Sequence, residues 1–336
     1  MNIIIPMAGM GKRMRPHTLT TPKPLLPIAG KPIVQRLVED IAKVCNDTIE
    51  NVAFIIAPHF GKEVEENLKA IAASLGATGH ICYQEEALGT AHAVYCAKEV
   101  LNGNVIVGFA DTLFRADFTI DPNNDGVIWV KQVDDPSAFG VVKLDNDNGI
   151  TDFIEKPEEF VSDLAIIGIY YFKDGARLKK EIEYLLDNDI RDKGEYQLTN
   201  ALENMKNQGL KFVPGKVIEW MDCGNKNATV HTNQRVLANI TDEQLVSASV
   251  QTNNAEIIEP CYIGENVEIT DSKIGPYVSI GSNTVVKNSV INNSIIQCDT
   301  VIENANFENS MIGNSVVYDG KANQLSISDF STVKMD

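Results

Sequence analysis

Long apolar runs are absent from this 336-residue sequence, whose longest stretches of apolar residues are five to seven long. A membrane-spanning helix needs roughly 20 such residues, so the sequence predicts no membrane segment. Basic residues are also in the minority, with 29 Lys and Arg against 46 Asp and Glu and a net charge of −17. This balance argues against a nucleic-acid partner, because such proteins present a basic surface to the phosphate backbone.

Cysteine is sparse and irregularly spaced. The six cysteines, at positions 45, 82, 96, 223, 261 and 298, form no CxxC pair. This distribution favours buried thiols in a reducing compartment. The sequence begins with a strand-like apolar run and shows no secretion signal. We therefore expect a cytoplasmic protein.

Acidic residues are absent from the first 38 positions, and the first acid is Glu39. Six cations occur in the same segment, so the rest of the chain sums to −23. They are Lys12, Arg13, Arg15, Lys23, Lys31 and Arg36. Most of them lie in a Gly- and Pro-rich loop that follows the apolar run at residues 3–5. A protein can bind several negative charges of one ligand in this way at the end of a strand, so we interpret the segment as a polyphosphate site.

Length and composition, with 44% hydrophobic residues, predict a globular protein of about two domains. The first 115 residues alternate short apolar strands with helical stretches. Strands are expected at residues 2–6, 52–58, 80–84 and 105–110. Helices are expected at residues 32–45, 61–75, 89–100, 175–187, 196–207 and 225–240. This pattern is typical of an α/β, Rossmann-like fold with a mostly parallel sheet and helices on both faces.

After residue 250 the period changes. Ile-Gly pairs recur at 263, 274, 280 and 312, aliphatic residues return near every sixth position, and spacings of seventeen also occur. The period does not fit a helix, and β-branched residues dominate. The pattern predicts a short parallel β-helix of three to four coils, each with three short strands. We therefore expect two domains, at residues 1–240 and 250–325.

Two common phosphate-binding loops are excluded by the residues that follow the first strand. Gly9 and Gly11 suggest a dinucleotide fingerprint, but Met14 stands in place of the third glycine. Four prolines between residues 16 and 27 also prevent the helix that would hold the pyrophosphate. Neither Gly-Lys pair has the spacing and the following Ser or Thr of a P-loop. What remains is an irregular loop whose glycines let backbone N–H groups approach a ligand.

The segment AGMGKRMRPHT at residues 8–18, continuing through PKPLLP at 22–27 to GKP at 30–32, closely resembles the signature loop of the sugar-1-phosphate nucleotidylyltransferases. Further segments agree with that family in the same order. They are Gln84 with LGTAH at 88–92, AD at 110–111, FG at 139–140, EKP at 155–157, GIY at 168–170, GEY at 194–196 and WMD at 220–222. The resemblance covers about residues 1–240. The C-terminal part is similar to the left-handed β-helix of hexapeptide repeats that several members carry.

In that family, a sugar 1-phosphate attacks the α-phosphorus of a nucleoside triphosphate, and pyrophosphate leaves. The resemblance implies that Arg13 holds the β- and γ-phosphates, Lys23 lies beside the α-phosphate, and Lys156 binds the sugar phosphate. Asp111 and Asp222 match the two carboxylates that hold the implied cofactor, Mg²⁺. Chemically, fixed cations and Mg²⁺ offset the repulsion between the two anionic substrates, and the attacking phosphate oxygen needs no general base.

The resemblance also implies the contacts to the rest of both substrates, and Gln84 with Gly89 resembles the pair that reads the base. The implied nucleotide-binding residues are Ala8, Gly9, Gly11, Arg13, Gln84, Gly89 and Thr90. The implied sugar-binding residues are Gly140, Glu155, Lys156 and Gly168.

The nucleotide and the sugar stay partly open. The LGTAHA run at 88–93 is similar to that of members that use UTP, but members that use dTTP have a related arrangement, and a purine is less favoured. Members specific for N-acetylhexosamines commonly have Asn two residues before the Gly of the GIY segment. Ile166 stands there in this chain, which favours glucose 1-phosphate. Asn200 stands where Asp is frequent in the family.

The β-helix is expected to serve assembly. Acyltransferases of this type need a histidine base, and the last histidine is His231, before the repeats. We therefore predict no acyltransferase activity and a homo-oligomer that uses the short coil stack. The competing interpretation of the whole chain is a non-catalytic regulatory subunit that binds sugar nucleotides. Such relatives have usually lost the loop cations or the metal carboxylates, and these are present here.

Overall fold

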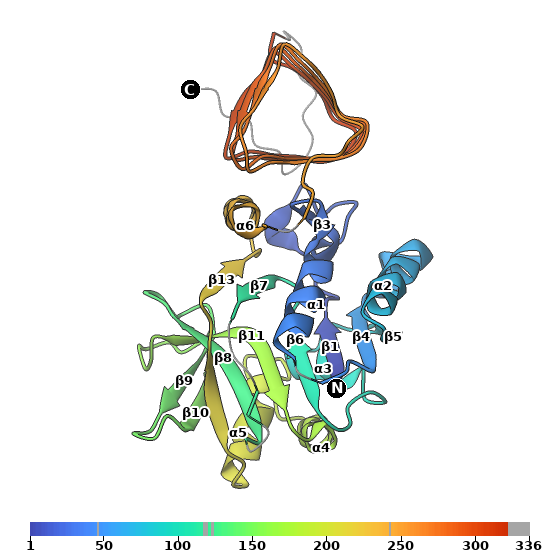
Figure 1. Cartoon of the computed structure of the whole chain (residues 1–336). Coiled ribbons are helices and arrows are strands. Elements are labelled where there is room, and N and C mark those ends of the chain that lie inside the picture. The colour runs from blue at the N-terminus through green and yellow to red at the C-terminus, as the bar shows by residue number, and fades with distance from the viewer. Residues whose placement is uncertain (46, 117–119, 122–123, 242, 322–336) are drawn as a thin grey trace. The chain divides into compact units, whose positions relative to one another are not determined.

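The computed structural model describes residues 1–45, 47–116, 120–121, 124–241 and 243–321 (Figure 1). The chain forms two compact units, and each is assembled from two stretches of sequence. The first, here called the sheet unit, comprises Met1–Gly9 and Gln35–Trp220. The second, here called the β-helix unit, comprises Met10–Val34 and the chain from Met221 onward. The expected boundary between residues 240 and 250 stays a prediction.

The sheet unit contains a nine-stranded mixed sheet in the order β10-β9-β11-β6-β1-β4-β5, and β8 pairs with both β11 and β12. Its strands are β1 Asn2–Pro6, β4 Asn51–Ile56, β5 Thr78–Tyr83, β6 Val105–Gly108, β8 Gly126–Gln132, β9 Gly140–Leu144, β10 Ile150–Glu155, β11 Leu164–Phe172 and β12 Phe212–Lys216. Strands β6, β1, β4 and β5 are parallel, whereas β11 is antiparallel to its neighbours. The predicted α/β fold is confirmed.

Helices cover both faces of the sheet because its central strands are apolar on both sides (Figure 1). All residues of β1 are buried. Ile4 belongs to a core that also contains Ala91 of α3 and Leu178 of α4. On the other face, Ile5 and Ile41 of α1 both approach Gly108. The helices are α1 Ile33–Val44, α2 Lys62–Ser74, α3 Thr90–Tyr95, α4 Gly175–Asp187 and α5 Leu198–Asn207, with the short elements η3 Pro58–Phe60 and β7 Thr112–Arg115.

Helix α3 is shorter than the helix expected at residues 89–100. Beyond Tyr95 the chain makes tighter i→i−3 bonds, from Ala97 N–H to Val94 O at 3.1 Å and from Val100 N–H to Ala97 O at 2.9 Å. These bonds belong to turns and not to an α-helix. The other predicted helices end within two residues of the observed ones.

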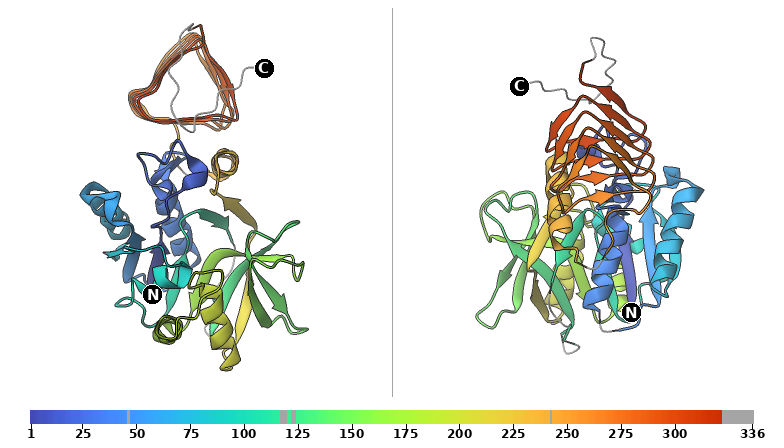
Figure 2. Two further views of the ribbon diagram at one scale, coloured as in Figure 1. Left: turned by 180° about the vertical axis from the view of Figure 1, so that it is seen from behind. Right: turned by 45° about the horizontal axis from the view of Figure 1, so that its top comes forward.

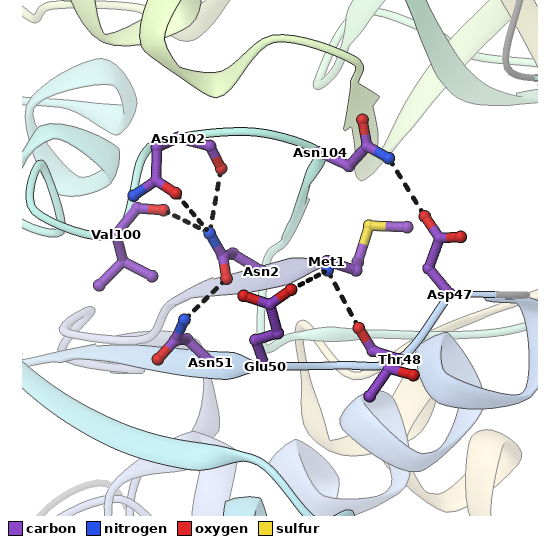
Figure 3. Close-up of polar contacts among 9 residues, drawn as sticks. All are labelled: Met1, Asn2, Asp47, Thr48, Glu50, Asn51, Val100, Asn102 and Asn104. Atoms are coloured by element: carbon purple, nitrogen blue, oxygen red, sulfur yellow. Dashed lines mark hydrogen bonds and ion pairs between the residues drawn. The ribbon is translucent and has the colours of Figure 1, made fainter.

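The amino end of β1 is fixed by a buried amide (Figure 3). Asn2 Nδ2 donates to the carbonyl oxygens of Val100 and Asn102, both at 3.0 Å, and Asn2 Oδ1 accepts from Asn51 Nδ2 at 2.9 Å. His80 Nε2 bonds to Asn51 Oδ1 at 2.8 Å. Polar side chains thus tie the amino ends of β1, β4 and β5 together, whereas the predicted phosphate loop follows the carboxyl end of β1.

The β-helix unit contains three parallel sheets (Figure 2). The first has β14 Gln251–Asn253, β17 Glu268–Thr270, β20 Val285–Lys287, β23 Val301–Glu303 and β26 Val317–Asp319. The second has β15 Glu256–Ile257, β18 Lys273–Ile274, β21 Val290–Asn292 and β24 Asn306–Glu308. The third has β16 Tyr262–Ile263, β19 Ser279–Ile280, β22 Ile295–Ile296 and β25 Met311–Ile312. The described residues thus complete four coils and begin a fifth, which slightly exceeds the prediction of three to four.

The coils are held by a buried aliphatic interior and by polar ladders at their corners. The aliphatic residues at the repeating positions, including Ile263, Ile280 and Ile302, are almost fully buried. At one corner, Asn266 donates to Asn283, and Asn283 donates to Asp299, at 3.2 and 3.1 Å. All three have positive φ angles, which Asn and Asp tolerate better than most residues. The register confirms a parallel β-helix, consistent with the expected left hand.

The remainder of the β-helix unit consists of the loop at 10–34 and one long helix. The loop contains η1 Lys12–Met14, η2 Lys23–Leu25 and the hairpin of β2 Pro27–Ile28 with β3 Lys31–Pro32. Strand β13 Glu219–Asp222 leads to α6 Lys226–Asn239, which Asn225 caps by accepting from Ala228 N–H at 3.1 Å. Among the described residues, none of the helices has the length and apolarity required to cross a membrane.

Candidate active site

The loop at residues 10–34 folds tightly around Gly11, whose φ is +58°. The Gly11 carbonyl oxygen accepts from Met14 N–H at 2.9 Å and from Thr18 Oγ1 at 2.8 Å. A methyl group added at Gly11 would lie 3.0 Å from Lys23 Cβ. Both the backbone angle and this contact require glycine. One compact turn therefore presents Lys23 together with Arg13, which is exposed.

The six cations of the N-terminal segment do not share one environment. Lys31 forms an ion pair with Glu243 at 3.0 Å. Arg36 is buried on α1 in the sheet unit. The charge count of the sequence therefore overstates the charge that this segment offers to a ligand.

Arg13 and Asp222 meet beside Gly224. The Asp222 carboxylate accepts from Gly224 N–H at 2.9 Å. A methyl group added at Gly224 would lie 3.0 Å from both Asp222 carboxylate oxygens and 3.2 Å from Arg13 Nη2. The neighbouring Cys223 is fully buried and serves the packing of this segment. A cation and a carboxylate that the sequence separates by more than 200 residues are thus brought together within one unit.

In the sheet unit, Gln84 is oriented by two partners. Its Nε2 donates to Gly89 O at 3.3 Å and lies 3.2 Å from His92 Nδ1. Burial lowers the pKa of His92, which favours the neutral ring and leaves Nδ1 able to accept this bond. Because both contacts use the amide nitrogen of Gln84, its carbonyl oxygen is, among the described residues, the group left to recognise a ligand.

Gly89 and Thr90 join this region to the GEY segment at 194–196. A methyl group added at Gly89 would lie 2.5 Å from Tyr196 O, and the φ of Gly89 is +121°. Thr90 Oγ1 donates to Gln197 Oε1 at 3.1 Å and accepts from Leu198 N–H at 2.9 Å. The Thr90 hydroxyl thus holds the starts of α3 and α5 together, and its expected contact with a nucleotide stays a prediction.

The expected sugar contacts converge from three strands and a helix. A methyl group added at Gly140 would lie 3.2 Å from Glu155 Oε2 and 3.3 Å from Ile166 Cδ1. Thr199 Oγ1 donates to the same Glu155 oxygen at 3.2 Å, and Lys156 Nζ lies 3.4 Å from Glu155 Oε1. The Lys156 side chain is 48% exposed, against 12% for that of Glu155. A fixed carboxylate thus lies beside a cation that remains accessible to a ligand.

Asp111 approaches this region through a distortion of β11. The pairing of β11 with β8 is irregular between Ile166 and Tyr170, and Gly168 in between has φ +85°. Gly168 O accepts from Phe109 N–H at 3.0 Å, two residues before Asp111. Burial and the carboxylates of Glu155 and Asp111 raise the pKa of Tyr170 well above its usual value. Tyr170 therefore lies within the electrostatic reach of both carboxylates.

The predicted metal ligands fit the chemistry of Mg²⁺ in donor type. Asp111 follows β6 and Asp222 ends β13, and both supply the hard oxygen donors that this ion prefers. Within the described parts of the chain, no group of three or more His, Cys, Asp or Glu side chains could hold a metal. A site of two carboxylates would leave the rest of the coordination shell to phosphate oxygens and water.

Ala8 and Gly9 lie two and three residues after β1, and a methyl group added at Gly9 would meet no atom of the described residues within 4 Å. Three other residues interact with the predicted site residues without having been predicted themselves: His92, Tyr170 and Thr199. His92 and Tyr170 lie within motifs of the sequence, but their contacts depend on packing. Thr199 reaches Glu155 from 44 residues away, and no local pattern signals that contact.

The chain is similar to several known proteins. Residues 2–239 match the family model described as Nucleotidyl transferase. A glucose-1-phosphate thymidylyltransferase of Streptomyces antibioticus is 31% identical over 310 residues, which cover 84% of this chain and 83% of that relative. Bifunctional protein GlmU of Methanococcus vannielii is 30% identical over 310 residues, which cover 85% of this chain and 69% of that relative. A solved UDP-glucose pyrophosphorylase complexed with UDP-glucose shares the fold, with a TM-score of 0.58, 22% identity and coverage of 71% of this chain and 99% of that one.

Proposed function

This chain belongs to the nucleotidyl transferase family, and from that premise we propose that it joins glucose 1-phosphate to a pyrimidine nucleotide. The general reaction is that of a sugar-1-phosphate nucleotidyltransferase, in which a nucleoside triphosphate and a sugar 1-phosphate give a nucleoside diphosphate sugar and pyrophosphate. The observation that carries the choice of nucleotide is the orientation of Gln84.

Gln84 supports a pyrimidine with a hydrogen on N3. Its amide nitrogen is engaged by Gly89 O and His92 Nδ1, so its carbonyl oxygen can accept a hydrogen bond. Uracil and thymine donate from N3, whereas the N3 of cytosine carries no hydrogen. A site that is built to accept a hydrogen bond at the position of N3 disfavours a base that has no donor there. UTP and dTTP are therefore the proposed substrates, and the thymidylyltransferase relative is consistent with dTTP.

Ile166 supports glucose 1-phosphate over an N-acetylated sugar. Its Cδ1 approaches Gly140 together with Glu155 Oε2, in the region that we assign to the sugar. An acetamido group would need a hydrogen-bonding partner when buried there, and the aliphatic Ile166 offers none. Glu155, oriented by Thr199, would accept hydrogen bonds from sugar hydroxyls.

The phosphate chemistry needs cations and positioning. Two unit charges about 4 Å apart repel by roughly 4 kcal/mol at an effective dielectric of 20. We assign Lys156 to the phosphate of the sugar, Lys23 to the α-phosphate and Arg13 to the β- and γ-phosphates. An oxygen of the sugar phosphate attacks the α-phosphorus and forms a new bond to it. The bond between the α-phosphorus and the oxygen that bridges to the β-phosphate breaks, and its electron pair leaves with pyrophosphate. Arg13 would stabilise the charge on that leaving group.

Asp111 and Asp222 would hold Mg²⁺. When bound, the ion would offset phosphate charge during transfer. Both carboxylates are anionic oxygen donors, as this ion requires.

We also propose the setting of the enzyme. All six cysteines are thiols, which fits the reducing environment of the cytoplasm. Residues 1–240 would form the catalytic domain and residues 250–325 an assembly domain that makes a homo-oligomer. A monomer mass in light scattering, unchanged after removal of the chain beyond residue 250, would contradict that role in assembly.

The proposed reaction is tested by pyrophosphate release with Mg²⁺, over a grid of five nucleoside triphosphates and several sugar 1-phosphates. We expect release only when both substrates are present, with UTP or dTTP and with glucose 1-phosphate. Equal or faster release with CTP would contradict the assignment of Gln84. Preference for N-acetylglucosamine 1-phosphate would contradict the assignment of Ile166.

A further inference from the structure

Helix α6 contains a fully buried amide that contacts two distant parts of the β-helix unit. Asn233 Oδ1 accepts from Ala29 N–H at 2.9 Å and from Ser279 Oγ at 2.7 Å. Asn233 Nδ2 donates to Tyr277 O at 3.4 Å. Ala29 lies in the β2–β3 turn, near the end of the loop that carries Arg13 and Lys23. Ser279 lies on β19 in the second coil of the β-helix. One side chain thus bonds both to the loop and to the coil stack.

A second contact joins the same loop to the first coil. A methyl group added at Gly30 would lie 2.2 Å from the ring of Tyr262, which belongs to β16. The φ of Gly30 is +83°, so the backbone angle also requires glycine at this position. The ring of Tyr262 therefore packs directly on the backbone at the tip of the β2–β3 hairpin. Lys31, next in the chain, pairs with Glu243 in the segment between α6 and the coils.

The start of α6 is also held by the coil stack. Lys226 Nζ donates to Asn309 O, after β24, at 2.7 Å. Burial and the nearby charge of Lys226 lower the pKa of His17 in the loop. Thr229 Oγ1 lies 3.5 Å from Met14 Sδ, and Met14 directly follows Arg13. Asp222 precedes α6 by four residues. The helix therefore lies between the β-helix and the two charged groups, Arg13 and Asp222, that meet beside Gly224.

We propose that the first two coils of the β-helix position the phosphate loop against Asp222, and that Asn233 is the positioning residue that joins them. This inference rests on the proposed function for the importance of Arg13 and Lys23 to turnover. It assigns the β-helix a part in the active site in addition to assembly. Small displacements of groups that bind phosphate cost large factors in rate, so a hydrogen bond at the base of the loop can affect the chemistry.

The test compares two chemically identical changes in the same β-helix. Ser279→Ala removes the shorter of the two bonds between the coils and Asn233, and it leaves the bonds from Asn233 to Tyr277 O and to Ala29. Ser289→Ala is the matched control, because Ser289 is similarly buried and its hydroxyl bonds to backbone atoms of the coils, donating to Lys287 O at 2.7 Å and accepting from Ala305 N–H at 3.0 Å. Both variants should lose similar thermal stability, since each loses hydroxyl bonds inside the β-helix.

Two readouts separate positioning from stability. Amide hydrogen exchange over residues 10–32 should be faster in Ser279→Ala than in Ser289→Ala, by about 3- to 10-fold as expected for one lost hydrogen bond. The KM for the nucleoside triphosphate should rise by a similar factor in Ser279→Ala only, and the KM for the sugar phosphate should change less. Asn233→Leu should show larger effects of the same kind if it folds.

The exchange readout does not depend on turnover. Equal exchange in the two serine variants would overturn the inference, and so would faster exchange in Ser279→Ala with an unchanged KM for the nucleotide. Absence of pyrophosphate release from the unmodified protein would instead contradict the proposed function. The two failures are therefore distinguishable.

Discussion

Lys156, which we assign to the phosphate of the sugar, has a strained backbone. Its φ is +40°, a region that costs an ordinary L-residue roughly 1–2 kcal/mol. Its N–H donates to Phe139 O at 3.1 Å, and its carbonyl oxygen accepts from Lys193 Nζ at 2.7 Å. The surrounding structure thus holds the strained conformation in place. Such outliers cluster at functional sites, where they aim a side chain.

We expect Lys156→Ala and Lys156→Gly to lose binding of the sugar phosphate equally, with at least a 10-fold rise in its KM, because both remove the same cation. They should differ in stability. Glycine relieves the positive φ but has a more flexible unfolded chain, so Lys156→Gly should be more stable than Lys156→Ala by about 0.5–1 kcal/mol. Steady-state kinetics and urea unfolding measure the two effects. An unchanged KM in Lys156→Ala would remove this residue from the site.

Asp111→Asn tests the proposed metal site at the same scale. The amide has nearly the shape of the carboxylate but lacks its charge, so it should hold Mg²⁺ poorly. We expect turnover to fall more than 100-fold, with an unchanged thermal midpoint within about 1 °C. Asp163→Asn is the control, because Asp163 is a peripheral carboxylate that bonds to Gln132. Full activity of Asp111→Asn at limiting Mg²⁺ would show that the carboxylate is not a ligand.

At this scale the sequence predicted residues more readily than their partners. The motifs of the nucleotidylyltransferase family marked Gln84, Gly140 and Glu155. They did not show that His92 orients Gln84 or that Thr199 orients Glu155, because each orientation depends on the packing of separate elements. Lys31 shows the opposite error. Its charge counted toward the phosphate site, whereas the structure pairs it with Glu243, more than 200 residues later.

Among the helices and strands, those with a clear periodicity of apolar residues were predicted well. Strand β1 agrees to the residue, and α4 begins and ends where its apolar pattern does. Helix α3 was predicted too long, because its apolar residues continue into a series of tight turns that the period alone does not distinguish. In the β-helix, the repeat of seventeen holds for the first coils. It becomes sixteen where Val285 pairs with Val301, so a fixed spacing could not count the coils.

The polar tie at the amino end of β1 yields a prediction about elements. Asn2→Leu would leave the carbonyl oxygens of Val100 and Asn102 and the Nδ2 of Asn51 without this partner (Figure 3). Buried polar groups that lose a partner cost about 1–3 kcal/mol each, and partial relaxation makes about 2–3 kcal/mol a reasonable total. Substrate KM values should stay unchanged, because the site lies at the other end of this strand.

The matched control for that change is Asn104→Ala. The Asn104 amide donates to Asp47 at the surface, at 3.1 Å, so its loss should cost less than about 0.5 kcal/mol. Urea unfolding measures both variants. A cost for Asn2→Leu as small as that of the control would show that water or rearrangement replaces the buried bonds.

At the scale of the whole molecule, the sequence pattern and the compact units of the structure divide the chain in different places. The sequence changes period near residue 250, which suggests a catalytic part followed by an appended one. The structure groups residues 10–34 with the β-helix, through contacts such as Ala29 with Asn233, 204 residues apart. Neither composition nor periodicity carries information on such long-range contacts. The predicted phosphate loop and a repeat domain that the sequence treats as separate therefore belong to one packed unit.

Three thiols predict how the stability of the whole molecule changes in alkali: that of Cys261 is buried, and those of Cys45 and Cys96 are half-buried. Burial, with a contribution from Asp47, raises the pKa of Cys45 to about 12, and burial raises the pKa of Cys96 and Cys261 to about 11. The pKa of a thiol in an unfolded chain is about 8.5. Between these values the unfolded chain has lost protons that the folded chain retains, so the free energy of unfolding must fall as pH rises. Below about pH 8 the thiols contribute no pH dependence.

Cys261→Ala isolates one of these contributions. Between the pKa of the unfolded thiol and that of the folded thiol, each thiol lowers the free energy of unfolding by up to about 1.4 kcal/mol per pH unit. The variant should be less stable than the unmodified protein at pH 7.5, because it lacks buried sulfur and the bond from Sγ to Ile258 O. Its stability should then decline less steeply between pH 9 and 10.5, so that the two curves converge. Urea unfolding under reducing conditions at several pH values measures both curves, and Tyr and Lys contributions cancel in the difference. Parallel curves would mean that Cys261 ionises equally in the folded and unfolded chain, which its burial in the first coil should prevent.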